Sequence, residues 1–335
     1  MLGGARARLA RRLRRYSARG VVLCYHRVAG PQLDPAALDV PPDMFAAHMD
    51  VLRRVACPLA LGEFERRRRD GQLPARAVAV TFDDGYADNL HAALPILEAQ
   101  GIPATVFVTT GGIGAATEFW WDALERACYA SAALPARLVL EVNGERVVRD
   151  LDEAARAPRP ASGLDADDTR RPLYDWLSAW LRVRPPAVQR EVMVALQQWA
   201  GVEAAARPTH RTLREDELVR LAQSPHIEIG AHSVTHPVLG LLDSAAQRDE
   251  CVRGRESLNR WLGATPVMFA YPFGEGAAVT RAAEAAVRAA GFEAAFTTDA
   301  RAAWRWNRRT AVPRFAMQAW SAAEFARRLE VWFLE

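Results

Sequence analysis

The feature that most constrains the fold is a repeated alternation of short apolar runs with longer amphipathic segments. The runs are continuously hydrophobic, as is typical of parallel strands that are covered on both faces. They are Val21–Tyr25, Val78–Phe82, Ala104–Thr109, Ile227–Gly230, Val267–Tyr271 and Phe292–Thr297, with a weaker candidate at Val312–Phe315. The number of alternating units predicts an α/β fold built as a parallel barrel, complete or distorted, in preference to an open doubly wound sheet.

The amphipathic segments between these runs are predicted as helices. They are Met44–Val55, Ala87–Gln100, Leu213–Gln223, Ala245–Leu262, Val279–Ala289 and Ala322–Phe333. Two start signals support the assignment, because Thr212 and Glu215 have the spacing of a capping box and Ser244 suits an N-cap.

The alternation stops between about residues 112 and 208. Within this stretch, Leu138–Val142 and Glu145–Arg149 flank Asn143-Gly144, which predicts a β-hairpin on a type I′ turn. Later segments have helical periodicity. We therefore expect an insertion at about 112–208 within a barrel of residues 20–335, and not an independent domain. Core packing explains the tryptophans of the insertion most simply, and a wall or lid that stacks on sugars is the alternative.

Residues 1–19 form an arginine-rich arm without acidic residues. The apolar stretch that follows is too short for a secretory signal, which needs about 7–15 apolar residues. Leu2, Leu9, Leu13 and Tyr16 can share one helical face opposite the arginines, an arrangement that suits an anionic membrane surface. A solvated basic tail and a transit peptide are the alternatives. We expect a cytoplasmic protein, with peripheral contact to the inner membrane through this arm left open.

Composition excludes several classes of function. Lysine is absent, so all 43 basic residues are arginine, and Schiff-base, P-loop and kinase-type lysine chemistry is excluded. A net charge of +3 is too small to indicate nucleic acid as the main partner. No run approaches the ~18 apolar residues of a membrane span. The four scattered cysteines are expected to be buried thiols.

Two short motifs carry the chemistry. Thr81-Phe82-Asp83-Asp84-Gly85 places adjacent carboxylates where a predicted strand ends, which is the catalytic end of a parallel barrel. Another predicted strand leads into His232-Ser233-Val234-Thr235-His236, whose spacing puts both imidazoles on one side of a helical turn. Two histidines and one carboxylate leave coordination positions of a metal open for water and substrate. A turn and a surface helix are the simpler explanations of each motif alone, but together the motifs predict a metal site.

These motifs resemble the first two signatures of the polysaccharide deacetylase (NodB-homology) family, carbohydrate esterase family four. Tyr271-Pro272-Phe273-Gly274 looks like the third signature. The resemblance covers roughly Val21–Thr110 and Ile227–Phe315. It implies a distorted (β/α) barrel and metal-dependent removal of N- or O-acetyl groups from sugars.

Matched residue by residue, the resemblance implies that Asp84, His232 and His236 bind one divalent metal ion. Zn²⁺ is the first candidate for this ion, with Co²⁺ and Ni²⁺ as alternatives. Asp83 is implied as the general base. In the third signature, the resemblance implies that the backbone N–H of Phe273 is an oxyanion donor, and we place Tyr271 beside the substrate.

The sequence also departs from the family pattern. The arginine that usually opens the third signature is missing, and no histidine follows His236. Some permuted members carry a Tyr-His pair on the first strand, and Tyr25-His26 is similar to that pair. We therefore assign His26 as the general acid. Arg314 is either the replacement partner of Asp83 or part of a structural salt bridge.

The sequence thus predicts a metal-dependent hydrolase that removes an N-acetyl (or O-acetyl) group from a sugar of a polysaccharide, a glycolipid or its precursor. A deformylase that acts on a lipid-linked sugar is the first alternative. A carbohydrate-binding barrel without catalysis is the second, and the presence of Asp83 beside Asp84 argues against it.

Overall fold

The computed structural model describes residues 18–30, 33–142, 144–157 and 168–334. Its central sheet contains six parallel strands in the order in which they occur along the chain. These strands are β1 (Arg19–Tyr25), β3 (Ala77–Phe82), β4 (Ala104–Val108), β7 (Ile227–Ala231), β8 (Met268–Ala270) and β9 (Ala294–Phe296). All six coincide with predicted apolar runs, and their side chains are almost entirely buried, as expected when helices cover a parallel sheet.

One further segment brings the two ends of the sheet together. Val312 forms a parallel bridge to Phe296 of β9, and β11 (Phe315–Ala316) pairs in parallel with β1. The sheet therefore curls until both of its end strands contact the same segment. This confirms the predicted distorted barrel. Two short strands, β2 (Cys57–Pro58) and β10 (Ala303–Trp304), extend the sheet beside β3 and β1.

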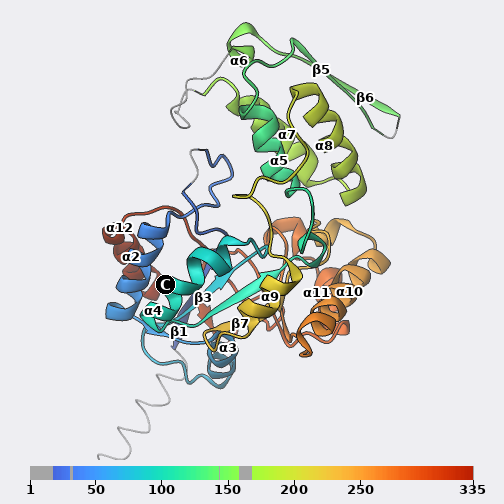
Figure 1. Cartoon of the computed structure of the whole chain (residues 1–335). Coiled ribbons are helices and arrows are strands. Elements are labelled where there is room, and N and C mark those ends of the chain that lie inside the picture. Colours follow the sequence, from blue (N-terminus) through green and yellow to red (C-terminus); the bar gives the residue numbers. More distant parts are fainter. Residues whose placement is uncertain (1–17, 31–32, 143, 158–167, 335) are drawn as a thin grey trace, which may run out of the picture.

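Helices pack around the sheet (Figure 1). The predicted ones are α2 (Pro42–Val55), α4 (Leu94–Gln100) after a π-helical turn at Asn89–Ala93, α9 (Glu215–Ala222), α10 (Ser244–Leu262), α11 (Arg281–Ala289) and α12 (Ala322–Leu334). The sequence did not predict α3 (Leu61–Asp70), which is rich in arginine. It packs because Arg68 is buried and donates to Glu65 at 2.6 and 2.7 Å, so a charged residue occupies an inward-facing position.

Both predicted helix caps were wrong by one or two residues. The N-cap of α10 is Asp243, which accepts a backbone hydrogen bond, and not Ser244. The N-cap of α9 is Arg214, whose backbone N–H donates to Glu217 at 2.9 Å, and Thr212 lies before it. Aspartate caps as well as serine does, so the sequence did not distinguish adjacent candidates.

Among the described residues, the predicted insertion contains the remaining strands and α-helices and extends from one end of the barrel, at the top of Figure 1. They are α5 (Trp120–Tyr129), β5 (Arg137–Val142), β6 (Glu145–Asp150), α6 (Glu153–Arg156), α7 (Arg171–Arg182) and α8 (Pro186–Ala200). Their buried apolar side chains form a cluster of their own. The hairpin is confirmed, since Val142 pairs with Glu145 and Gly144 has a φ of 79°. Asn143 lies outside the described residues.

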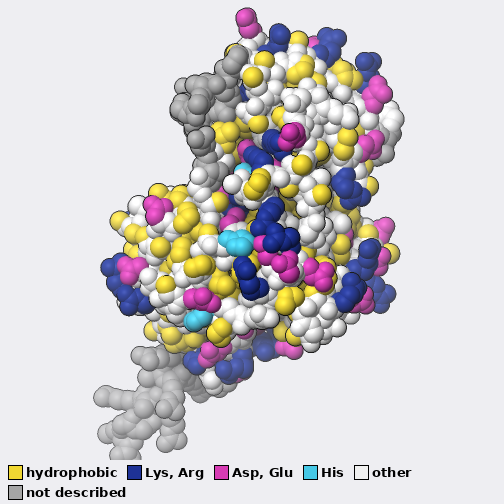
Figure 2. Space-filling view, in the orientation of Figure 1, with side chains coloured by type: hydrophobic (Ala, Val, Ile, Leu, Met, Phe, Trp, Pro, Cys, Tyr) yellow, Lys and Arg dark blue, Asp and Glu magenta, His cyan; other side chains and the backbone are white. Residues whose placement is uncertain are grey.

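The face of the molecule in Figure 2 carries interspersed basic and acidic side chains. No helix of the described residues is long and apolar enough to cross a bilayer. Nearly all of the arginine-rich arm, residues 1–17, lies outside the described residues, so its membrane contact stays a prediction.

Candidate functional site

Asp83 lies directly after β3 and pairs with Arg314 inside the barrel. The Nη1 and Nη2 atoms of Arg314 donate to Oδ1 and Oδ2 of Asp83, each at 2.7 Å. Arg314 is fully buried, and its remaining donors contact Thr81 Oγ1 at 3.0 Å and the carbonyl of Thr297 at 3.1 Å. This bidentate arrangement fixes both the orientation and the charge of the carboxylate. Arg314 therefore lies where a partner of Asp83 must lie, which was one of the two roles left open for it.

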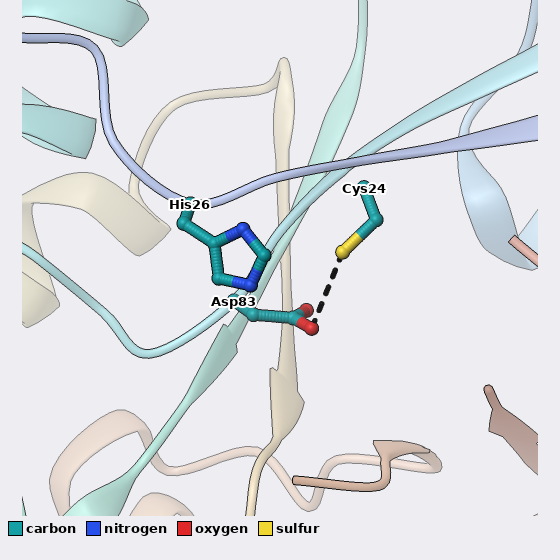
Figure 3. A group of neighbouring side chains, drawn as sticks. All are labelled: Cys24, His26 and Asp83. Carbon is teal, nitrogen blue, oxygen red and sulfur yellow. Dashed lines mark hydrogen bonds between the residues drawn. The ribbon is translucent and has the colours of Figure 1, made fainter. Parts of the chain in front are cut away.

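Burial and neighbouring charge act on Asp83 in opposite directions. Burial raises the pKa of this carboxyl, but the guanidinium of Arg314 and the neighbouring His232 and His26 together lower it by more. The net pKa of Asp83 lies below its ordinary value, so the group is an ionised carboxylate at neutral pH. The thiol of Cys24 donates to Oδ2 of Asp83 at 3.3 Å, a contact that the sequence did not predict (Figure 3).

His26 follows β1, and its ring lies beside the Asp83 carboxylate (Figure 3). Cys24, His26 and Asp83 each offer an atom within 4.8 Å of the others. His26 is partly exposed, whereas Asp83 and Cys24 are buried. The backbone of His26 is held by Asn89, which donates to its carbonyl at 3.0 Å. The imidazole is therefore the partly exposed member of this group of three side chains.

Asp84, His232 and His236 also come together, with ligand atoms within 4.8 Å of one another. Oδ1 of Asp84 lies 3.2 Å from Nε2 of His236 and 3.5 Å from Nε2 of His232. All three residues are buried. Burial lowers the pKa of His232 to about 4, which keeps this imidazole neutral, as metal coordination requires.

The donor set of this triad fits a metal ion. Nδ1 of His232 contacts the carbonyl of Ala270 at 2.8 Å, so this nitrogen carries the proton and Nε2 presents its lone pair. Oδ1 of Asp84 is buried and has no hydrogen-bond partner among the described residues. A buried carboxylate oxygen that faces an imidazole lone pair is costly unless a cation lies between them. Buried histidine and aspartate ligands in this arrangement could therefore bind a divalent cation.

The loop that carries the histidines is not the helical turn that we predicted. Residues 232–238 contain no helix, and Ser233 and His236 have φ values of 65° and 57°. Glu250 of α10 stabilises this unusual backbone, because its Oε2 accepts the N–H groups of Val234 and Thr235 at 2.8 and 2.9 Å. The two imidazoles meet through left-handed residues, and no sequence motif pointed to Glu250.

The third motif lies next to the triad. Phe273 also has a positive φ, of 63°, and its ring centroid is 4.8 Å from that of His236. Among the described residues, the backbone N–H of Phe273 has no acceptor. Arg182 of α7 lies 4.5 Å from the Phe273 ring centroid and donates to Glu275 at 2.9 Å. The insertion therefore contacts the loop that borders the site.

Tyr271 does not lie where we placed it. Its side chain is fully buried, its hydroxyl donates to the carbonyl of Thr310 at 2.9 Å, and its ring packs against Phe269. The side chain belongs to the core and is not available to a substrate. Tyr271 points inward because residues two apart in extended chain share a face, and Phe269 faces the core.

Another tight cluster joins Asp122 and Glu125 of α5, in the insertion, to His210. Its carboxylates are already occupied by protein donors. Arg207 donates to both oxygens of Glu125 at 3.0 Å, and the Tyr86 hydroxyl donates to Asp122 at 2.7 Å. We assign no ligand to this cluster.

Comparison with known structures identifies similar folds. A Streptococcus pyogenes deacetylase, PplD, determined in complex with acetate, aligns with a TM-score of 0.59 and 16% identity over 93% of this chain and 99% of that one. A de-N-acetylase from Aggregatibacter actinomycetemcomitans aligns with a TM-score of 0.56 and 15% identity over 93% of this chain and all of that one, at 100%. At sequence identities of 15–16%, these alignments establish a similar fold and nothing further.

Sequence comparison agrees with the fold. The Bacillus subtilis (strain 168) protein YxkH, which is named after the polysaccharide deacetylases, is 34% identical over 95 residues. That alignment spans 28% of this chain and only 33% of YxkH. The sequence model of the polysaccharide deacetylase family matches residues 70–132 and 190–295, which is just over half of the chain, and the gap between the two matched ranges lies inside the insertion. The chain belongs to the polysaccharide deacetylase family.

Proposed function

We propose that this protein is a metal-dependent hydrolase that removes an N-acetyl (or O-acetyl) group from a sugar of a polysaccharide, a glycolipid or its precursor. One observation carries the proposal: a buried carboxylate, Asp83, is held ionised by Arg314 directly beside the Asp84, His232 and His236 triad. A protein that only binds sugar or metal has no use for this adjacent base.

Asp84, His232 and His236 would hold the divalent ion, with Zn²⁺ as the first candidate and Co²⁺ or Ni²⁺ as alternatives. When bound, such an ion acidifies a water molecule and polarises the acyl carbonyl. The backbone carbonyl of Ala270 keeps His232 in the tautomer that leaves Nε2 free. The adjacent carboxylates then have separate tasks, Asp84 as a ligand and Asp83 as a base.

Asp83 takes the proton from the attacking water. Arg314 directs the carboxylate and prevents its protonation at neutral pH, and Nε2 of His232 lies 3.9 Å from Oδ2 of Asp83, so the base borders the metal ligands. The N–H of Phe273 is free to stabilise the developing oxyanion. His26, beside Asp83 and partly exposed, protonates the departing nitrogen. His26→Ala is therefore expected to lower kcat by about 10²–10⁴-fold.

An acid-release assay tests the proposal. The purified protein, loaded with Zn²⁺, is incubated with N-acetylated and with N-formylated amino-sugar oligomers, and acetate and formate are measured. Acetate release that depends on Zn²⁺ supports the deacetylase. Formate release alone replaces it with a deformylase, and release of neither acid while Zn²⁺ stays bound identifies a binding protein. The acetate in the S. pyogenes structure belongs to that protein, and it makes acetate the first product to measure here.

We also propose that the protein is cytoplasmic and that the arginine-rich arm holds it near an anionic membrane, where a lipid-linked sugar precursor would lie. Deletion of residues 1–19 should reduce co-sedimentation with vesicles that contain anionic lipid and leave co-sedimentation with neutral vesicles unchanged. Equal co-sedimentation of the full chain and the truncated protein with anionic vesicles would contradict the proposed membrane contact. Co-sedimentation does not depend on hydrolysis of the acyl group, so the membrane contact and the hydrolase activity are tested independently.

A further inference from the structure

The two histidines of the triad are held in different ways. Nδ1 of His232 contacts the carbonyl of Ala270, whereas Nδ1 of His236 is buried and has no hydrogen-bond partner among the described residues. A metal-binding imidazole normally needs a partner on its second nitrogen to fix the ring orientation. Another contact must therefore orient the His236 ring.

Aromatic side chains surround His236. The nearest is Trp121 of α5, whose ring centroid lies 4.6 Å from that of the imidazole at an interplanar angle of 55°. Phe273 follows at 4.8 Å, and Phe119 lies at 6.2 Å. Three apolar rings thus lie close to the imidazole, and the largest of them comes from the insertion.

Trp121 is itself fixed on several sides. Its Nε1–H donates to the hydroxyl of Tyr86 at 2.7 Å, and that hydroxyl donates to Asp122 at 2.7 Å. Phe119 stacks on the indole at 4.5 Å with an interplanar angle of 11°. Trp121 is only 6% exposed. A buried indole with a satisfied N–H and a stacked face has little freedom to move.

The anchor of Trp121 leads back to the first motif. Tyr86 lies two residues after Asp84 on the same turn, and its ring also lies 4.9 Å from the guanidinium of Arg27. One short segment of chain therefore carries a ligand of the triad and the hydroxyl that holds Trp121. The indole in turn packs against His236, so Trp121 connects the two halves of the triad.

We infer that Trp121 is a positioning residue that orients the His236 imidazole by packing, in place of the missing hydrogen bond to Nδ1. The inference rests on the proposed function, because it assigns a role toward the metal ion that Asp84, His232 and His236 would hold. It also gives the first helix of the insertion a part in the metal site.

The test measures metal affinity in the absence of turnover. Apoprotein is titrated with Zn²⁺ in competition with a chromophoric chelator, and with Co²⁺ while its absorption spectrum is recorded. Trp121→Ala is expected to weaken Zn²⁺ binding by about 10–100-fold, the range for loss of a group that orients a ligand. The ligand-field bands of bound Co²⁺ should change as well. Tyr86→Phe removes the anchor of the indole and should change both quantities in the same direction, by less.

Trp120→Ala is the matched control. Trp120 precedes Trp121 on α5 and packs edge-to-face against it at 5.4 Å, but no ring contact joins it to His236. Its removal should alter Zn²⁺ affinity by no more than about twofold. Should Trp121→Ala fail to give the circular dichroism of a folded protein, Trp121→Leu serves as the second variant, because it fills part of the space and removes the aromatic face that packs on the imidazole.

Zn²⁺ affinity within about twofold of the wild type and an unchanged Co²⁺ spectrum in a folded Trp121 variant would overturn the inference. An equal loss of affinity in Trp120→Ala would also overturn it, because it would indicate general damage to α5. A wild-type protein that binds Zn²⁺ but releases no acid would contradict the proposed function but not this inference. Failure of the wild-type protein to bind Zn²⁺ would sink both.

Discussion

One ion pair of the barrel and one of the insertion lie in opposite environments. In the barrel, the side chains of Asp83 and Arg314 are 2% and 0% exposed. In the hairpin of the insertion, the side chains of Arg137 and Asp150 are 63% and 67% exposed, although their atoms approach as closely as 2.6 Å. Distance alone therefore does not rank these pairs. Solvent screens the hairpin pair, whereas the barrel pair sets the charge of a group that we propose as a catalytic base.

The largest effect is expected from Asp83→Asn. The amide keeps the volume of the carboxylate but cannot accept a proton, so kcat should fall by about 10²–10⁴-fold while bound Zn²⁺ stays stoichiometric. Acid release and elemental analysis measure the two quantities. Asp84→Asn is the matched control, and it should lose the metal as well as the activity. Full turnover by Asp83→Asn would exclude this residue as the base.

Arg314→Met tests the other side of the same pair. It leaves the Asp83 carboxylate buried without its counter-charge, and we expect a loss of about 3–5 kcal/mol in the free energy of unfolding. Urea denaturation measures this loss. The double variant Asp83→Asn with Arg314→Met should recover part of it, because no buried charge then stays unpaired. Equal stability of the single and the double variant would contradict this account.

The ion pair of Glu217, on α9, is intermediate in exposure between the barrel pair and the hairpin pair. The Glu217 side chain is 3% exposed, but its partner Arg211 is 26% exposed. Burial raises the pKa of Glu217, but hydrogen bonds from Arg211 and other donors lower it more strongly, from 4.5 to about 2. A lowered pKa means that the carboxylate stabilises the fold above pH 4.5 and that this contribution is lost as the pH falls toward about 2.

Glu217→Gln should therefore destabilise the protein near neutral pH, by about 1 kcal/mol because water screens the partners. The difference from the wild type should shrink as the pH is lowered through 4.5. Urea midpoints at several pH values measure both. A difference that stays constant with pH would show that the charge of Glu217 is not what stabilises α9.

The smallest effect is expected at the hairpin. Arg137→Ala removes an ion pair that is open to solvent on both sides, so the urea midpoint should not change measurably. Raising the salt concentration should likewise leave the midpoints of the wild type and Arg137→Ala equal. A clear destabilisation would show that the comparison between the barrel and the hairpin overstates the part played by burial.

The sequence predicted what depends on local pattern. The strands were found because parallel strands under helices are continuously apolar, and the paired carboxylates and histidines were found because they directly follow such strands. The fold class, the barrel and the hairpin follow from the same patterns. The grouping of Asp84, His232 and His236 also agreed, because the carboxyl ends of parallel strands meet at one edge of the sheet.

What the sequence missed depends on contacts between distant segments. Arg314 meets Asp83 across 231 positions, so no spacing rule could choose between its two roles. Cys24 and Glu250 touch the site through tertiary packing alone. The helical turn that we predicted at residues 232–236 was wrong, because histidines with this spacing can also be brought together by left-handed residues.

The segment that joins the ends of the sheet has a consequence for the order of events during synthesis. Val312 and β11 are among the last parts of the barrel to leave the ribosome, and Arg314 lies between them. A nascent chain that has already made β3 thus holds the Asp83 carboxylate without its guanidinium partner. Asp83 acquires this partner only when the C-terminal segment docks, so the unfinished chain lacks the ion pair that holds the carboxylate we propose as the base.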